Sequence, residues 1–178
     1  MKKILIQMSV RGEVDTLLES PTPLSPDPVA EGGGGGCYAS VHDYTRVLSD
    51  LLRDAPRLSR KETVDTLFTA QFPDNSPSLA GLQTSNVTYK PTLDDSLKGV
   101  TINYGLAGIL VIEDVVRENY FRPKGTMSWS GVANMVWGIN RERGVAWLWA
   151  TQVLPFGDRG ELELAVRFET AVWRSLVM

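Results

Sequence analysis

Residues 124–152 read KGTMSWSGVANMVWGINRERGVAWLWATQ, and this stretch contains three short apolar runs that each suit a β-strand. The runs cover residues 125–131, 134–140 and 145–152. The connection 141–144 is polar and ends in a glycine, where a positive φ angle costs little. We therefore predict that the last two runs pair as an antiparallel hairpin.

Side chains along this hairpin should alternate between the two faces of a sheet. Apolar side chains share a face at alternate positions: Met135, Trp137 and Ile139 in the second run, Trp147 and Trp149 in the third. An earlier apolar run at 107–112 adds a strand, so we expect an antiparallel sheet of about four strands. Apolar residues then recur at three- and four-residue spacing over 161–176, which predicts a C-terminal amphipathic helix that packs on the sheet.

The first half of the chain reads as loop and helix. Four prolines and five consecutive glycines in residues 19–36 exclude regular helix or strand there. A helix should begin after Ser40, which can cap it, and a second after Ser59, where Glu62 completes a Ser-x-x-Glu capping box. A short helix is expected near residues 78–83.

These elements predict one α+β domain over residues 1–178. It comprises the Pro/Gly-rich loop at 19–36, a helical region at 39–98, and antiparallel strands with a closing helix at 99–178. In this order the helices come first and the sheet follows them.

Composition argues against several classes of partner. Lys and Arg number 18 against 21 Asp and Glu, and neither sign forms a run, so we expect no nucleic-acid binding. The longest nearly apolar run, 145–150, is far shorter than the roughly 20 residues of a membrane helix, so we expect no membrane span. The single cysteine, Cys37, favours a reducing, cytoplasmic location. Cys37 and the only histidine, His42, provide no metal-ligand spacing, and we expect neither a metal nor a cofactor.

Two blocks of the sequence carry a family resemblance. Residues 124–131, Lys-Gly-Thr-Met-Ser-Trp-Ser-Gly, are followed after the hairpin by residues 150–158, Ala-Thr-Gln-Val-Leu-Pro-Phe-Gly-Asp. Together they resemble the C-terminal signature of the class C β-lactamase-related serine esterases and transesterases, in particular the fungal acyltransferases that esterify polyketides. The glycine run at 32–36 with Tyr38 resembles the family's glycine-rich turn. The resemblance implies a partial β-lactamase/transpeptidase-like fold.

The resemblance also implies a role for particular residues. Trp129, Ser130 and Gly131 correspond to the family's third motif, a strand beside the nucleophile, and Val132 would supply a backbone N–H to the oxyanion of the tetrahedral intermediate. Candidate pocket-lining residues are Gly34, Gly35, Gly36, Tyr38 and Lys124. The implied ligand is a hydrophobic small-molecule acyl substrate, and the implied chemistry is acyl transfer or ester hydrolysis.

The departures from the family pattern are as informative as the match. No serine in the chain is followed three residues later by lysine, and no tyrosine is followed two residues later by asparagine, so the nucleophile and proton-shuttle motifs are absent. About the first half of the family's chain therefore has no counterpart, and one edge or face of the sheet should be exposed. Three hypotheses remain open. The chain is a family member that is not catalytic alone, or it is a non-catalytic protein that binds a ligand or complements an N-terminal half or a second copy. The third hypothesis is a chain without function of its own.

Overall fold

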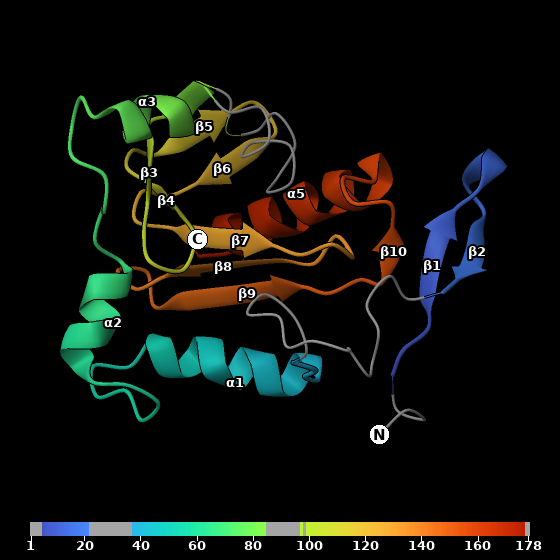
Figure 1. The fold of residues 1–178 in the computed structure, drawn as a ribbon, viewed down its shortest axis with the longest axis horizontal. Helices are drawn as coiled ribbons and strands as arrows, with labels where there is room; N and C mark the ends of the chain where they lie inside the picture. Colours follow the sequence, from blue (N-terminus) through green and yellow to red (C-terminus); the bar gives the residue numbers. More distant parts are fainter. Residues whose placement is uncertain (1–4, 22–36, 85–96, 98, 177–178) are drawn as a thin grey trace.

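The computed structural model describes residues 5–21, 37–84, 97 and 99–176, and its centre is a five-stranded antiparallel sheet (Figure 1). The strand order is β3-β4-β7-β8-β9. The strands are β3 (Ile102–Tyr104), β4 (Ile109–Val111), β7 (Met127–Ser130), β8 (Val136–Asn140) and β9 (Val145–Trp149). The predicted antiparallel sheet is confirmed, and it has one strand more than expected because β3 is only three residues long and has no distinct apolar run.

The β8–β9 hairpin is the most regular part of the sheet. Gly144 in its turn has a φ of 65°, as the turn required. Gly138 lies opposite Trp147, and a Cβ atom on Gly138 would lie only 2.5 Å from Cε2 of the indole. The tryptophan ring therefore lies directly over the glycine, which leaves no room for a side chain at position 138.

Each face of the sheet carries its own apolar core, because successive residues point to opposite sides. Ile109, Val136 and Trp147 pack on one face with Trp173 of helix α5 (Arg159–Arg174). The opposite-face core is built from Leu110, Met127, Ile139 and the partly buried Leu51, Leu52 and Phe68. In Figure 1 the sheet lies between α5 and helix α1 (Val41–Leu51). The predicted C-terminal helix packed on the sheet is confirmed.

The three helices that the structure describes in the first half occupy the predicted places, but not every predicted cap is present. Ser40 caps α1 and accepts a hydrogen bond from the backbone N–H of Asp43, as predicted. Helix α2 (Lys61–Leu67) instead has Arg60 as its N-cap, without a side-chain hydrogen bond, so the predicted Ser59 capping box is wrong. The chain stays extended through Arg60, which places Ser59 one residue too early. Helix α3 (Pro77–Thr84) occupies the expected place.

Strands precede the helices, which corrects the predicted order. Strand β1 (Met8–Arg11) lies between β2 (Leu17–Ser20) and β10 (Val153–Leu154), and its pairing with β10 is parallel. The 3-10 turn η2 (Glu13–Asp15) joins β1 to β2. The last two residues of β2 fall in the segment predicted as loop, because Met8 and Ser9 pair with them. The remainder of that segment, from residue 22, lies outside the described residues.

A small separate hairpin completes the fold. Strands β5 (Val115–Arg117) and β6 (Tyr120–Arg122) pair only with each other, and β6 packs against α5. Among the helices that the structure describes, none is both long and apolar enough to cross a bilayer.

Candidate functional site

The Trp129–Gly131 segment leads into a tight turn between β7 and β8. The N–H of Asn134 donates to the carbonyl of Gly131 at 3.0 Å, and the N–H of Gly131 donates to the carbonyl of Met135 at 2.9 Å. Asn134 has a φ of 59°, in the left-handed region that Asn tolerates. This is a three-residue hairpin loop in which a turn is followed by one left-handed residue.

The turn leaves the backbone N–H of Val132 without a hydrogen-bond partner in the part of the chain that the structure describes. The N–H and the carbonyl of Gly131 both bond to the two residues that precede β8, and hydrogen-bonding direction alternates along a strand. The Val132 side chain is 44% exposed. A Cβ on Gly131 would meet only the Met135 side chain, at 3.7 Å, so packing within the described chain does not require glycine there. The open position is able to receive an acceptor oxygen from a ligand.

Two neighbouring turns carry exposed or partly exposed apolar side chains, which we call the Trp129 surface: Tyr104 and Leu106 at the β3–β4 turn, and Trp129, Val132 and Met135 at the β7–β8 turn. The Trp129 ring is 36% exposed and contacts the Tyr104 ring edge-on, with centroids 5.6 Å apart. Tyr104 in turn contacts Phe72, at 6.3 Å between centroids. An aromatic group that is held in place yet open to solvent can bind an apolar ligand.

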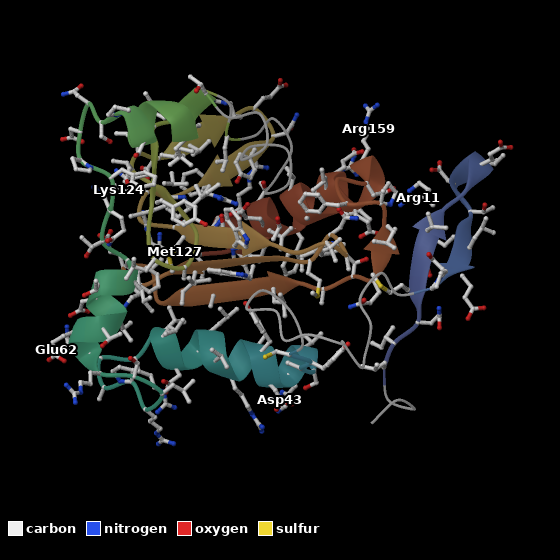
Figure 2. All side chains as sticks on the ribbon, viewed as in Figure 1. Arg11, Asp43, Glu62, Lys124, Met127 and Arg159 are labelled. Atoms are coloured by element: carbon white, nitrogen blue, oxygen red, sulfur yellow. The ribbon has the colours of Figure 1, made fainter. Side chains whose placement is uncertain are left out.

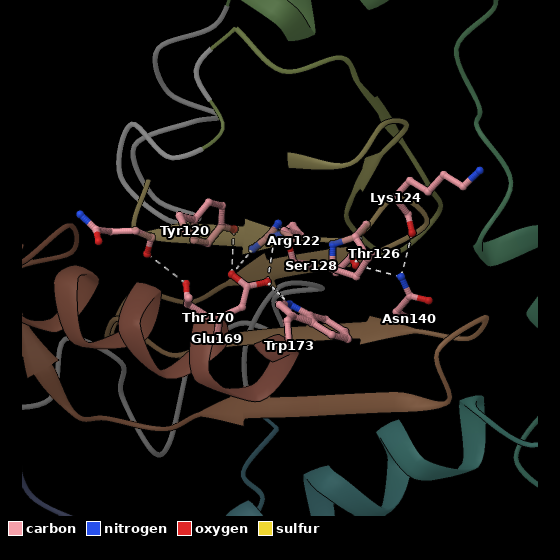
Figure 3. A network of polar contacts seen from close by, with 11 residues as sticks. Tyr120, Arg122, Lys124, Thr126, Ser128, Asn140, Glu169, Thr170 and Trp173 are labelled. Atoms are coloured by element: carbon pink, nitrogen blue, oxygen red, sulfur yellow. Dashed lines mark hydrogen bonds and ion pairs between the residues drawn. The ribbon is translucent and has the colours of Figure 1, made fainter. Parts of the chain in front are cut away.

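Behind the strand, a buried polar network holds Ser128, the residue before Trp129 (Figure 3). Arg122 donates to the Ser128 hydroxyl at 2.8 Å and to both carboxylate oxygens of Glu169 at 2.8 and 2.9 Å. The same carboxylate accepts from the Tyr120 hydroxyl at 2.8 Å and the Trp173 indole at 3.0 Å. Burial raises the pKa of Glu169, while its four donors favour the ionised form. Burial also raises the pKa of Tyr120 well above its ordinary value.

The structure brings together some of the predicted site residues and separates others. Trp129, Ser130, Gly131 and Val132 form one continuous end of β7 and its turn. Lys124 lies just before β7, at the opposite end of that strand, and therefore does not join these four residues (Figure 2). Its carbonyl accepts a hydrogen bond from the side-chain amide of Asn140.

The remaining predicted site residues belong to the glycine-rich segment and the start of α1. Gly34, Gly35 and Gly36 lie outside the described residues. Tyr38 is exposed just before α1, which begins at the same end of the sheet as the β7–β8 turn in Figure 1. Within the described residues, no hydrogen bond or ring contact joins it to the Trp129 surface.

Sequence reasoning missed three residues of the site. Tyr104 meets Trp129 through a ring contact between separate strands, and Met135 joins the turn through the hydrogen bond from the N–H of Gly131; no local motif revealed either. Asn134 carried a usable signal, because asparagine between two strand patterns often marks a left-handed turn position. Among the described residues, no group of three or more His, Cys, Asp or Glu side chains is placed to hold a metal.

Comparison with known proteins gives a consistent result. No protein-family model matches the chain. The acyltransferase calJ of Penicillium decumbens is 35% identical over 150 residues, which are 83% of this chain and 34% of that protein. The homologues of this chain are fungal acyltransferases. The monacolin J acid methylbutanoyltransferase of Aspergillus terreus is 29% identical over 144 residues, 79% of this chain and 34% of that protein.

The fold supports the same relationship. The unliganded simvastatin synthase of Aspergillus terreus superposes with a TM-score of 0.79 at 25% identity, over 95% of this chain and 42% of that one. The predicted resemblance to this acyltransferase group is therefore confirmed, and the chain corresponds to a C-terminal part of it. The chain spans about a third of the length of the curated relatives that it matches.

Proposed function

We propose that this chain forms the oxyanion-side wall of a serine acyltransferase or esterase site. An apolar acyl group would lie on the Trp129 surface, and its carbonyl oxygen would accept a hydrogen bond from the N–H of Val132. The observation that carries the proposal is that this unpaired N–H follows the exposed Trp129 by three residues, at the same end of β7. A fixed donor aimed at a developing oxyanion is often the largest single contribution to acyl-transfer catalysis.

The family chemistry moves an acyl group from an ester or thioester to an alcohol, or to water, by way of an acyl-serine. We place this chemistry in secondary metabolism, with a polyketide as the acylated partner. The 178 residues contain no Ser-x-x-Lys motif. We therefore propose that the chain binds the acyl group but does not form the acyl-enzyme alone.

A direct test of the missing nucleophile uses the purified chain with p-nitrophenyl esters and a fluorophosphonate serine probe. We expect no turnover and no labelling. Covalent labelling of a serine, in particular Ser40 or Ser128, would show that the chain carries its own nucleophile.

Binding is tested separately by NMR titration with hexylphosphonate, whose tail and oxygens imitate an acyl chain and an oxyanion. We expect saturable shifts at the Val132 amide and the Trp129 indole, and Trp129→Ala should weaken binding about tenfold through lost apolar contact. Phe168→Ala is the matched control, because this ring is also 36% exposed but lies on α5, across the sheet. Equal affinities for the two variants would contradict the proposed site.

A second candidate function is complementation by another chain. It is favoured by strand β2, where Leu17 and Leu18 are 53% and 55% exposed although consecutive residues point to opposite faces. Light scattering should then detect self-association, or turnover should appear when a polypeptide that carries a Ser-x-x-Lys motif is added. A monodisperse monomer that gains no activity in this mixture would contradict it.

A further inference from the structure

Asn134 is a buried polar residue whose side chain makes three hydrogen bonds. It is 1% exposed. Its amide nitrogen donates to the carbonyls of Val153 and Pro155, both at 2.8 Å, and its amide oxygen accepts from the N–H of Gly157 at 2.7 Å. These bonds attach the β7–β8 turn to β10 and to the loop that leads into α5.

The backbone conformation alone does not explain this asparagine. A φ of 59° at the third loop position is most easily adopted by glycine, so glycine would suffice if the turn needed only its shape. The side chain instead satisfies two carbonyls and one N–H in a segment 19 to 23 residues further along the chain. Asn134 therefore fixes where the turn lies as well as how it bends.

The position of the turn determines the position of the Val132 N–H. Asn134 lies two residues after the unpaired donor, Val132. Its own N–H donates to the carbonyl of Gly131 and closes the turn. Ala133 between them is buried, whereas the Val132 side chain is exposed and anchors little. A donor that is already in position costs no reorganisation during the reaction, and the Asn134 side chain adds three bonds that hold this loop from outside.

We propose that Asn134 is a positioning residue that holds the Val132 N–H in place for an acyl oxygen. The inference rests on the proposed function, because it assumes that this N–H receives the oxyanion. Asn134 itself does not touch the ligand and acts only through the turn.

The test uses ¹⁵N NMR of the whole chain. Asn134→Gly keeps the positive φ and removes only the three side-chain bonds. We expect faster internal motion of the Val132 amide, and about tenfold weaker binding of hexylphosphonate at Val132, while the Trp129 indole still responds. A general loss of stability would not weaken the response of the Val132 amide while leaving the response of the Trp129 indole in place.

Asn140→Gly is the matched control. Asn140 is also a fully buried asparagine with three side-chain hydrogen bonds, but it lies at the other end of β8. The Asn140→Gly variant should lower the melting temperature without changing the mobility of the Val132 amide or the affinity for hexylphosphonate. If Asn134→Gly does not fold, Asn134→Asp is measured instead, since it keeps the acceptor for Gly157 and loses both donors.

The outcomes separate the two proposals. If Val132 responds to hexylphosphonate in the wild type and equally in the Asn134 variant, the positioning role is wrong while the proposed function stands. If Val132 does not respond in the wild type, the proposed oxyanion role itself is wrong.

Discussion

The guanidinium of Arg122 and the carboxylate of Glu169 are joined by two hydrogen bonds of 2.8 and 2.9 Å, and neither side chain is exposed to solvent. The pair links β6 to α5, and through the Ser128 hydroxyl it reaches the strand that carries Trp129. Every side-chain hydrogen-bonding atom of Glu169 is used. A buried pair of this kind need not stabilise more than an apolar pair would, but breaking it leaves an uncompensated charge.

We therefore predict that Glu169→Gln lowers the free energy of unfolding by about 3–5 kcal/mol, because Arg122 stays buried without its counter-ion. Urea unfolding measures the effect. Glu163→Gln is the control on the same helix, since its pair with Arg167 is largely exposed and should leave the unfolding midpoint unchanged. Similar midpoints for both variants would mean that the buried network is not essential.

Two glycine substitutions should act in opposite directions. Gly138→Ala places a methyl group 2.5 Å from the Trp147 indole and should cost about 1–3 kcal/mol through overpacking. Gly81 lies in α3, where a Cβ would meet nothing within 4 Å beyond its chain neighbours and its own helix backbone, so Gly81→Ala should stabilise by about 0.5–1 kcal/mol. Thermal unfolding of both variants is the measurement, and a stabilised Gly138→Ala would contradict the close packing of the ring.

Alanine substitution distinguishes the two helix caps predicted from the sequence, Ser40 and Ser59. Ser40→Ala should destabilise by about 1 kcal/mol, because the Asp43 N–H at the start of α1 loses its acceptor. Ser59→Ala should have no measurable effect, since α2 is preceded by Arg60 and has no side-chain cap. If both variants lose the same free energy of unfolding in denaturant, Ser59 caps α2 after all, as the sequence predicted.

Asp158 should make the fold sensitive to acid. The hydrogen bond from Arg11, at 2.7 Å, is the largest of the causes that lower the pKa of this carboxyl, and the N–H of Glu161 adds to it. A lowered folded-state pKa means that the unfolded chain binds more protons as pH falls below about 4. The contribution is thus present above that pH and is lost as pH falls through the folded-state pKa.

Asp158 is the N-cap of α5, and asparagine caps a helix about as well as aspartate, so the variant Asp158→Asn isolates the charge. We expect the wild type to be the more stable protein at pH 6, and the difference in unfolding free energy to shrink as the pH falls through the acid range. A difference that does not depend on pH would show that the ion pair to Arg11 does not stabilise the fold.

Much of the chain's architecture was determined by local sequence. Alternation of apolar residues and a polar turn ending in Gly144 were sufficient to predict the β8–β9 hairpin, and Ser40 with an apolar stripe was sufficient for α1. Both depend on side-chain period and on hydrogen bonds between near neighbours, which act before distant parts of the chain meet. The Trp129–Gly131 motif likewise pointed to the acyltransferase group from sequence alone.

Only the tertiary structure decided what surrounds that motif. Arg122 meets Glu169 across 47 residues, Asn134 meets the 153–157 segment, and β1 pairs with β10 across almost the whole chain. The neighbouring sequence of these residues does not predict their partners, because each contact forms only where sheet register and helix packing bring remote segments together. The sequence therefore determined which strand carries the candidate site, and the fold determined how that strand is held and which of its N–H groups stays open.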